Sequence, residues 1–408
     1  MNNLLPQQEK ALAHRSDWKV GALFMKMGTG KTRVTVELVN QVTDLDLVVY
    51  VAPLRIIQPK EPNIPKISDE VQKWGGFNAK EVIYIGVETI GQSDRQFLQL
   101  YKKIATTWKT FLVVDESIKI KNIEAKRTKR LLQLSEMVEY KLILNGEPVT
   151  RDLLDLYPQM NFLDPRILRM SLPEFKNTFC KYTTVTKRFG GYKEYSKEFI
   201  TGYENIDYLY SLIGQYVFEC DLDLRIQQIY EDVSYSISDE DKQEYYRLKT
   251  EYLDDEKLMM MNNNIFLELT QKMQHGYCCS QEKFEAVEKW FGKYPEEKSI
   301  IFVKYIRSME ECKRRFPKAT VLNYKTGSYG LNLQHLPYTV YFDKTWDYGD
   351  VAQSKHRNYR VGQEQDCRYL SLTGDVGLEA LISENNKKKI GVSEYLKKIS
   401  REQLKKVL

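Results

Sequence analysis

The chain has 408 residues, which is enough for two or three domains that each bury a hydrophobic core. Its 61 Lys and Arg against 56 Asp and Glu leave a net charge of only +5, so overall charge does not by itself indicate a nucleic-acid partner. The six cysteines and four histidines form no zinc-ligand spacing. The N-terminus does not resemble a signal peptide, and no apolar run approaches the roughly 18 residues of a membrane span. We therefore expect a soluble, reduced, cytoplasmic protein.

A glycine loop follows the first apolar run of the chain. Gly21–Phe24 leads into Met27-Gly28-Thr29-Gly30-Lys31-Thr32, and a helical pattern follows, which is the order strand, loop, helix. Glycines allow successive backbone N–H groups to point at phosphates, and the start of a helix adds positive potential. We predict that this loop binds ATP, with Lys31 on the outer phosphates and Thr32 on Mg²⁺. The alternative is a chance turn before a surface helix.

Further apolar runs end in polar residues. They occupy residues 45–52, 111–114 and 140–144, and helix-length segments separate them. This pattern predicts an α/β fold with a doubly wound parallel sheet whose polar edge forms the site. Asp115 and Glu116 follow the run at 111–114, where we expect Asp115 to hold Mg²⁺ together with Thr32 and Glu116 to polarise the attacking water. In isolation, the two acids could instead be a solvated strand end.

Several of these stretches match a known family in the same order. Gln8, the glycine loop, Asp115–Asn122 and Leu144–Pro148 resemble the adenine-sensing glutamine and motifs I, II and III of superfamily 2 helicases. Gly327–Gln334 and Gln353–Gln363 resemble motifs V and VI of the Swi/Snf branch of that superfamily. The likeness extends from about residue 5 to about residue 380. It therefore covers nearly the whole chain.

The resemblance implies an ATP-driven DNA translocase with two RecA-like lobes, compact like phage-encoded members, and DNA as a partner in preference to RNA. It implies catalytic roles for Lys31, Asp115, Glu116, Arg357 and Arg360. By the same resemblance, Gln8, Gly330 and Gln353 join Met27, Gly28, Thr29, Gly30, Lys31 and Thr32 in binding the nucleotide, with Mg²⁺ on Thr32 and Asp115. Nucleic-acid contacts are implied for Pro53, Arg55, Lys121, Gly327, Ser328, Asn332 and Trp346.

The spacing of two arginines supports one of these roles. Arg357 and Arg360 stand at i and i+3, so on a helix they would share one face and could reach a phosphoryl group together. The alternative is an arginine pair on a solvent-exposed helix surface.

Three positions depart from the family pattern. Ile118 stands where the family usually has His, and Asn145 and Glu147 stand near positions where it has Thr or Ser. In the family these positions couple hydrolysis to movement of the lobes. The resemblance therefore bears more directly on ATP binding than on coupling.

The strand–helix rhythm stops after Pro165. Residues 175–199 interleave aromatic and basic side chains around Gly190-Gly191, which could form a nucleic-acid contact or an amphipathic hairpin packed on the protein. Helical patterns follow at about 239–252 and 265–275 and resemble the helical protrusion of Swi/Snf proteins. We therefore predict three parts: lobe 1 at residues 1–165, a mainly helical insertion at 166–279, and lobe 2 at 280–408.

The predicted second lobe is short. Apolar runs at residues 298–303, 321–324, 338–342 and 367–372 predict its strands. Only about 23 residues separate the first of these runs from the motif V glycines, so one strand–helix unit of the family is expected to be missing. The lysine-rich C-terminal stretch is predicted to be a basic helix, which could touch DNA or simply be a solvated face.

Three functions remain open from the sequence. The first is a translocase or helicase acting on double-stranded or branched DNA in replication or recombination. The second is an RNA-dependent ATPase, which the Swi/Snf-like motifs disfavour. The third is a nucleotide-dependent binding or recruitment protein whose ATPase is weak or vestigial, favoured by the unusual motif III and the short second lobe.

Overall fold

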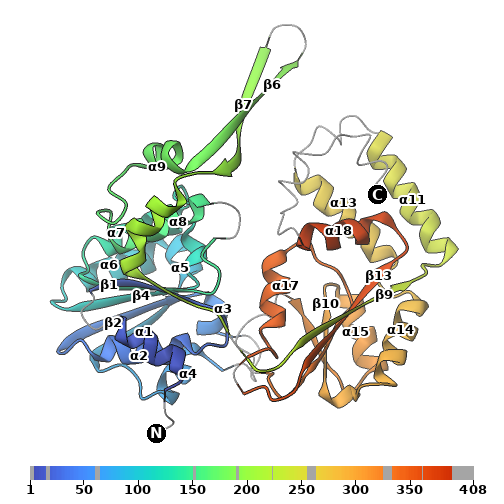
Figure 1. Ribbon diagram of the computed structural model, residues 1–408, viewed down its shortest axis with the longest axis horizontal. Helices are drawn as coiled ribbons and strands as arrows, with labels where there is room; N and C mark the ends of the chain where they lie inside the picture. The colour runs from blue at the N-terminus through green and yellow to red at the C-terminus, as the bar shows by residue number, and fades with distance from the viewer. Residues whose placement is uncertain are drawn as a thin grey trace. The chain divides into compact units, whose positions relative to one another are not determined.

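The computed structural model describes residues 4–14, 19–59, 65–149, 153–189, 193–222, 224–254, 263–324, 333–360 and 362–387. The chain divides into two compact units, Met1–Leu222 and Asp223–Leu408. Each unit is built around its own parallel β-sheet with helices packed on it (Figure 1). None of the helices in these ranges is long and apolar enough to cross a membrane.

The sheet of the first unit has six parallel strands in the order β3-β2-β4-β5-β1-β8. β2 and β4 are buried along nearly their whole length, as expected for parallel strands that are covered on both faces. The strand bounds are β1 Val20–Met25, β2 Leu45–Ala52, β3 Ala79–Gly86, β4 Thr110–Asp115, β5 Tyr140–Asn145 and β8 Val217–Cys220.

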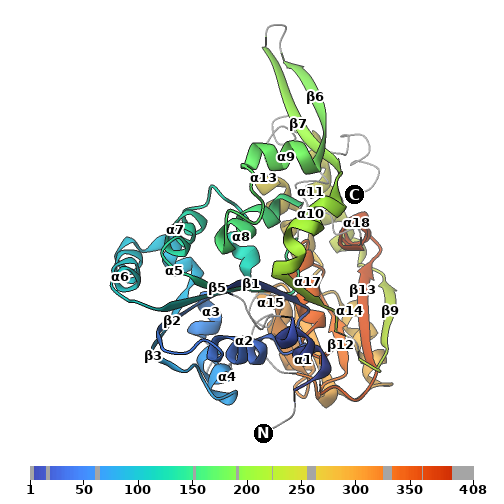
Figure 2. The same cartoon turned by 60° about the vertical axis from the view of Figure 1, so that its left-hand side comes forward.

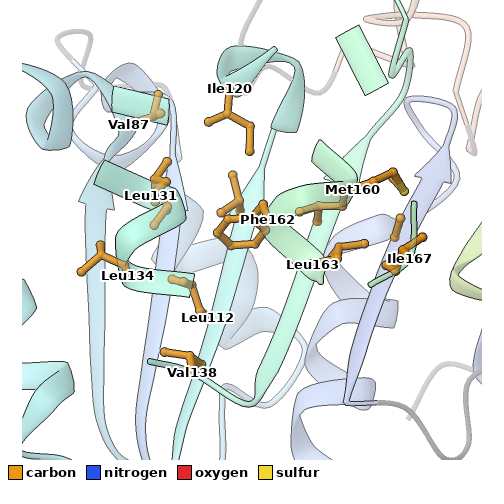
Figure 3. Packing of buried hydrophobic residues seen from close by; sticks show 14 of the residues in the cluster. Val87, Leu112, Ile120, Leu131, Leu134, Val138, Met160, Phe162, Leu163 and Ile167 are labelled. Atoms are coloured by element: carbon orange, nitrogen blue, oxygen red, sulfur yellow. The ribbon is translucent and has the colours of Figure 1, made fainter. Parts of the chain in front are cut away.

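Helices cover both faces of this sheet, as Figure 2 shows. On one face, α1, α2 and α4 pack on strand residues such as Tyr50 and Val113. On the other face, helices α5 to α10 pack on residues such as Leu112, which lies among Leu131, Leu134 and Phe162 in Figure 3. The helix bounds are α1 Pro6–Ala13, α2 Lys31–Asn40, α3 Leu54–Ile57, α4 Ile67–Lys73, α5 Val87–Gln92, α6 Asp94–Ala105, α7 Lys126–Ser135, α8 Leu156–Leu163, α9 Leu172–Phe179 and α10 Ile206–Ile213.

An antiparallel pair, β6 (Cys180–Phe189) and β7 (Lys193–Tyr203), forms a separate two-stranded sheet between α9 and α10. The sequence allowed a hairpin here. Its predicted turn, Gly190-Gly191, lies outside the described residues.

The sheet of the second unit has five parallel strands in the order β11-β10-β12-β13-β9. One face packs on a large cluster that includes Phe284 of α14 and Cys312 of α15, and the other on a smaller cluster around Phe302 and Tyr369. The bounds are β9 Gln228–Tyr235, β10 Ser299–Val303, β11 Thr320–Asn323, β12 Tyr338–Tyr341, β13 Cys367–Gly374, α11 Asp239–Asp254, α13 Asn263–Gly276, α14 Gln281–Phe291, α15 Ile306–Arg315, α17 Tyr348–Lys355 and α18 Gly377–Lys387.

The α/β class and the two parallel sheets are confirmed, and every apolar run predicted as a strand forms one. Three strands of the two parallel sheets were missed, namely β3, β8 and β9. β3 and β9 are edge strands with exposed residues along them, and β8 has only four residues, so none gives a long buried run. The lysine-rich stretch after residue 387, predicted as a basic helix, lies outside the described residues.

The predicted boundaries at 165 and 279 differ from the observed division. Residues 166–222 belong to the first unit, because β8 pairs with β1 and extends the first sheet. Residues 224–279 belong to the second unit, because β9 pairs with β13 along eight residues. The stretch predicted as one helical insertion is therefore shared between the two sheets, and it contains strands as well as the two predicted helices, α11 and α13.

Candidate nucleotide-binding site

The strand order of the first sheet brings three polar segments together. β5 lies between β4 and β1, with Asp115 opposite Leu144 and Phe24 opposite Asn145. All three strands are parallel, so their carboxyl ends meet at one edge of the sheet. The glycine loop, Asn145-Gly146-Glu147 and Asp115-Glu116 therefore share that edge, as the sequence predicted.

The glycine loop connects β1 to α2 with two left-handed residues. Gly28 has φ 83° and Gly30, the N-cap of α2, has φ 86°, a region that other residues adopt only with strain. Among the described residues, no side chain caps the start of α2. The Thr29 hydroxyl donates to the Lys26 carbonyl at 2.7 Å and closes the loop on itself. The N–H groups at the start of a helix favour a phosphate.

Gln8 of α1 is buried against this loop. Its amide nitrogen donates to the carbonyls of Thr29 (3.4 Å) and Gly30 (3.5 Å), and its amide oxygen accepts the N–H of Leu5 at 2.9 Å. A Cβ added at Gly30 would lie 2.0 Å from the Gln8 nitrogen. Gln8, which the sequence predicted to sense adenine, therefore also stabilises the glycine loop by hydrogen bonds.

Lys31 and Asp115 are electrostatic neighbours. The Lys31 ammonium donates to the Met25 carbonyl at 2.7 Å, and its charge lowers the pKa of Asp115. Burial nevertheless dominates and raises the pKa of Asp115 above its ordinary value. The carboxylate is oriented by the Tyr50 hydroxyl, which donates to one oxygen at 3.2 Å, and by the N–H of Glu116, which donates to the other at 2.8 Å. A cation beside Asp115 would offset the cost of burying this charge.

Glu116 itself has a strained backbone. Its φ of 51° and ψ of 53° place it in the left-handed region, which is uncommon for a residue other than glycine. It forms the N-cap of the short 3₁₀ helix Ser117–Ile120 that follows β4. Such strain concentrates at functional sites, where the surrounding structure holds it in place.

A buried hydrogen-bond network joins the segment after β4 to the segment after β5. The Ser117 hydroxyl donates to the Gln159 amide oxygen at 2.6 Å, and the Asn145 amide lies 3.5 Å from the Ser117 oxygen. The Gln159 amide nitrogen donates to the carbonyls of Pro148 (2.8 Å) and Asp155 (2.7 Å). Gln159 was not predicted, although a glutamine in the mostly apolar helix α8 is a recognisable signal.

The segment after β5 also contacts the glycine loop. The Lys26 ammonium lies 3.6 Å from the Glu147 carboxylate, and a Cβ at Gly146 would lie 3.5 Å from the backbone nitrogen of Met27. The two segments are therefore in direct contact.

The residues at this edge fit a magnesium–nucleotide group. Two left-handed glycines at the start of a helix suit phosphate oxygens, and Lys31 supplies a charge beside them. Asp115 is an oriented carboxylate, and Thr32 stands in the first turn of α2. Hydroxyl and carboxylate oxygens are ligands that Mg²⁺ prefers.

The residues implied for nucleic acid in the first unit lie near the same edge. Pro53 is the N-cap of α3 directly after β2 and is buried, and Arg55 on α3 is half-buried. The Lys121 ammonium lies 3.7 Å from the Asp155 carboxylate. The position after a strand end places these residues where ligands of parallel sheets bind.

In the second unit, Gly327, Ser328, Gly330 and Asn332 lie outside the described residues. Trp346 is 7% exposed, and its indole N–H donates to the Thr270 hydroxyl of α13 at 3.2 Å. This burial leaves the ring little surface for the nucleic-acid contact that the sequence implied.

The predicted arginine pair follows a helix without lying on it. Gln353 is on α17, but α17 ends at Lys355, so Arg357 and Arg360 follow in a turn and do not share a helical face. The turn is held by Asn358, whose amide donates to the Thr339 hydroxyl at 3.0 Å and accepts the Tyr369 hydroxyl at 3.1 Å. These hydrogen bonds satisfy the buried amide and fix the turn that follows α17.

Comparison with known proteins identifies a family. The family model of the SNF2-related domain matches residues 66–278, just over half of the chain. The Drosophila melanogaster protein "Helicase domino" is 34% identical over 128 residues, 31% of this chain and 4% of that protein. "Transcription regulatory protein SNF2" of Saccharomyces cerevisiae is 21% identical over 453 aligned positions, 91% of this chain and 26% of that protein. The chain therefore spans only a small part of the length of these relatives.

A solved structure is also similar along the chain. The "Sulfolobus solfataricus SWI2/SNF2 ATPase core in complex with dsDNA" aligns with 100% of this chain and 97% of its own, with 16% sequence identity and a TM-score of 0.42.

Proposed function

Because the chain belongs to the family of the SNF2-related domain, we propose that it is an ATP-dependent motor that moves on double-stranded or branched DNA. We propose a role in replication or recombination in the cytoplasm, which would be the host cytoplasm for a phage-encoded protein. The observation that carries the proposal is the shared edge of the first sheet, where the glycine loop and Asp115-Glu116 lie on neighbouring strand ends.

Each residue at that edge has a role in phosphoryl transfer. The loop amides and Lys31 bind and orient the phosphates, and Thr32 and Asp115 would hold the magnesium ion, which supplies charge neutralisation when bound. Glu116, set at the end of β4 in a strained conformation, orients and deprotonates the attacking water. The hydrogen bonds that join Ser117, Gln159 and the Pro148 carbonyl link conformational changes during hydrolysis at this edge to the segment after β5.

Arg357 and Arg360 are proposed to stabilise the phosphoryl group during transfer. Guanidinium groups bind transferring phosphoryl oxygens in a bidentate manner, and loss of such an arginine costs about 10³ to 10⁵ in rate. Asn358 positions the segment between them through its buried bonds to Thr339 and Tyr369. An Arg357→Ala or Arg360→Ala protein should therefore bind nucleotide and hydrolyse it poorly.

DNA is the nucleic acid along which we propose that the motor moves, for two reasons. Segments 327–334 and 353–363 resemble motifs V and VI of the Swi/Snf branch, and relatives of this chain carry the names "Helicase domino" and "ATP-dependent helicase brm". Pro53, Arg55 and Lys121 offer backbone and charge contacts without reading bases, so binding should be independent of sequence and steeply weakened by salt.

The deciding experiment is steady-state ATP hydrolysis with no nucleic acid, duplex DNA, single-stranded DNA or RNA. We expect duplex or branched DNA to stimulate hydrolysis most. Stimulation by RNA alone would replace this proposal with an RNA-dependent ATPase. No hydrolysis under any condition, with nucleotide still bound, would favour the recruitment protein.

Two variants and a control test the site itself. Lys31→Ala should lose more than nine-tenths of the turnover, and Glu116→Gln should bind ATP with Mg²⁺ but not cleave it. Lys102→Ala, on the exposed surface of α6 and away from the sheet edge, should match the wild type. A Glu116→Gln protein that no longer binds nucleotide would reverse the roles of Asp115 and Glu116.

We further propose that movement does not require efficient separation of the strands. Unwinding costs about 1.4 kcal/mol per base-pair step, which a motor without a separating element would have to obtain from thermal fraying. We expect ATP-dependent displacement of a third strand from a triplex and weak activity on a plain fork. Robust fork unwinding without triplex displacement would contradict this and would favour a strand-separating role for residues 182–195.

The alternative of a vestigial motor rests on the short second lobe and on the unusual motif III, which includes Asn145 and Glu147. In the structure, Asn145 still reaches the Ser117 hydroxyl, and Glu147 still reaches Lys26 of the glycine loop. The contacts between the two segments are thus present despite the unusual residues. This favours the active motor.

A further inference from the structure

Two neighbouring cysteines lie at the turn between α13 and α14 of the second unit. The Sγ atoms of Cys278 and Cys279 are 3.7 Å apart, which is within the range of a hydrogen bond between sulfur atoms. Cys278 is buried, whereas Cys279 is half-buried. The other four cysteines occur singly in the sequence. This turn therefore places two thiols where one can react with the other.

The two thiols differ in acidity. The hydrogen bond from the Cys278 thiol lowers the pKa of Cys279. The positive charges of Arg307 and Lys283 also lower the pKa of Cys279, against the opposing effect of burial. The same hydrogen bond, together with burial, raises the pKa of Cys278. Cys279 is thus the thiol that more readily becomes a thiolate, which is the reactive form of cysteine.

Cys220 provides a contrast within the same chain. It is the other half-buried cysteine and ends β8 of the first unit. Burial and the charge of Asp221 raise the pKa of Cys220, and its thiol donates to the Asp221 carbonyl at 3.2 Å. Partial exposure is therefore not what makes a thiol acidic in this protein. The neighbouring sulfur and the nearby positive charges distinguish Cys279 from Cys220.

The cysteine pair is joined to a buried ion pair of the second unit. The Lys283 ammonium donates to the Cys278 carbonyl at 3.2 Å and to the Asp343 carboxylate at 2.7 Å. Adjacent Cα atoms are about 3.8 Å apart, closer than the roughly 4.4–6.8 Å of ordinary disulfides. A disulfide between Cys278 and Cys279 would therefore distort the backbone at Cys278, and Lys283 would lose this carbonyl as an acceptor.

We propose that a hydroperoxide oxidises Cys278 and Cys279 to a reversible disulfide, and that this disulfide lowers the stability of the second unit. The Cys279 thiolate attacks one peroxide oxygen, the O–O bond breaks, and Cys279 becomes a sulfenic acid. The other oxygen takes a proton from solvent and leaves as an alcohol, or as water when the oxidant is hydrogen peroxide. The Cys278 thiol then attacks the Cys279 sulfur, and the sulfenic hydroxyl leaves as water with the thiol proton. The two thiols together lose two electrons, which the peroxide gains.

Mass spectrometry of the full chain after treatment with hydrogen peroxide tests the bond. Trypsin cuts after Lys272 and Lys283, so the peptide of residues 273–283 contains both cysteines and no others. Thiols that stay reduced are alkylated with iodoacetamide before digestion. This peptide should become lighter than its unmodified form by two hydrogen atoms, and dithiothreitol should return it to the doubly alkylated form. In the same sample, Cys279 should react at least about fivefold faster than Cys220.

Single variants separate the roles of the two sulfurs. Cys278→Ala should stop the reaction at a sulfenic acid on Cys279, which dimedone labels, because no second thiol is adjacent. Cys279→Ser should abolish both the dimedone label and the disulfide at this turn. Cys220→Ser is the matched control and should form the disulfide at the wild-type rate. The peptide map of the wild type tests the bond without relying on the folding of any variant.

The melting temperature tests the structural consequence. The oxidised wild type should melt about 3–12 °C lower than the reduced protein, as expected for one lost hydrogen bond of a buried charged group in a unit of this size. Differential scanning fluorimetry measures this shift, and dithiothreitol should reverse it. Cys279→Ser should show no shift that dithiothreitol reverses, which separates the disulfide from oxidation of methionine.

Three outcomes would overturn the proposal. A peptide of residues 273–283 that stays doubly alkylated while Cys220 is oxidised would show that the pair is not the reactive site. Oxidation of Cys279 to a sulfinic acid without a disulfide would show that Cys278 does not reach the Cys279 sulfur. An unchanged melting temperature with the disulfide formed would refute the connection to Lys283. None of these measurements uses ATP or DNA, so failure of the proposed motor function would be a separate result.

Discussion

Breaking the ion pair between Lys283 and Asp343 should destabilise the second unit strongly. The Lys283 ammonium on α14 lies 2.7 Å from the Asp343 carboxylate after β12, and the two side chains are 1% and 2% exposed. Asp343 also accepts the backbone N–H groups of Lys304 (2.9 Å) and Tyr305 (3.4 Å). The pair therefore ties α14 to the carboxyl ends of β10 and β12.

Lys283→Met leaves a buried carboxylate without its counter-ion, which typically costs about 3–5 kcal/mol. For a unit of this size, each kcal/mol lowers the melting temperature by about 2–4 °C, so a drop of roughly 6–20 °C is expected. Adding Asp343→Asn removes the unpaired charge and keeps an acceptor for the Lys304 N–H. The double variant should therefore recover at least half of the loss.

Thermal unfolding followed by calorimetry measures all four proteins of this double-mutant cycle. Lys19→Met, which removes one partner of the exposed Lys19–Glu139 pair, is the control and should leave the melting temperature unchanged. A Lys283→Met protein within about 1 kcal/mol of the wild type would refute the reasoning, because the buried charge would then not need its partner.

Three further predictions concern the first unit. Because burial raises the pKa of Asp115, the charge of this carboxylate opposes folding above that pKa. In differential scanning fluorimetry, ligand-free Asp115→Asn should therefore melt no lower than the wild type at pH 7.5, with the difference in melting temperature shrinking towards pH 4, and the variant should lose the stabilisation by Mg·ATP. A lower melting temperature of the ligand-free variant at pH 7.5 would contradict this. Gln8→Ala removes the bonds to the loop carbonyls and should weaken ATP binding about 2- to 10-fold by calorimetric titration, and unchanged affinity would show that these bonds are dispensable. Gln159→Leu removes the acceptor of the Ser117 hydroxyl and should lower the free energy of unfolding, measured with denaturant, by about 1–3 kcal/mol. The variant should still bind ATP, but DNA should no longer stimulate its ATP hydrolysis. Full stimulation by DNA would show that the network does not couple the two.

The sequence by itself determined the elements whose signals are local. Gly28 and Gly30 after an apolar run predict a loop that needs left-handed residues, and both adopt positive φ. The run at 111–114 predicts a buried strand, and a parallel sheet then requires Asp115 at its carboxyl edge. Such features depend on residues close together in the chain, so composition and spacing are sufficient.

The tertiary structure decided the features that depend on distant pairing. β8 and β9 are recognisable only from their partners β1 and β13, because hydrogen bonds to a strand far along the chain, rather than a hydrophobic run, define them. The turn that follows α17 is fixed by the buried bonds of Asn358 to Thr339 and Tyr369, which lie on two strands of the sheet. Pairing and register are set by which strands meet in the folded chain, and this information is distributed over residues far apart in the sequence.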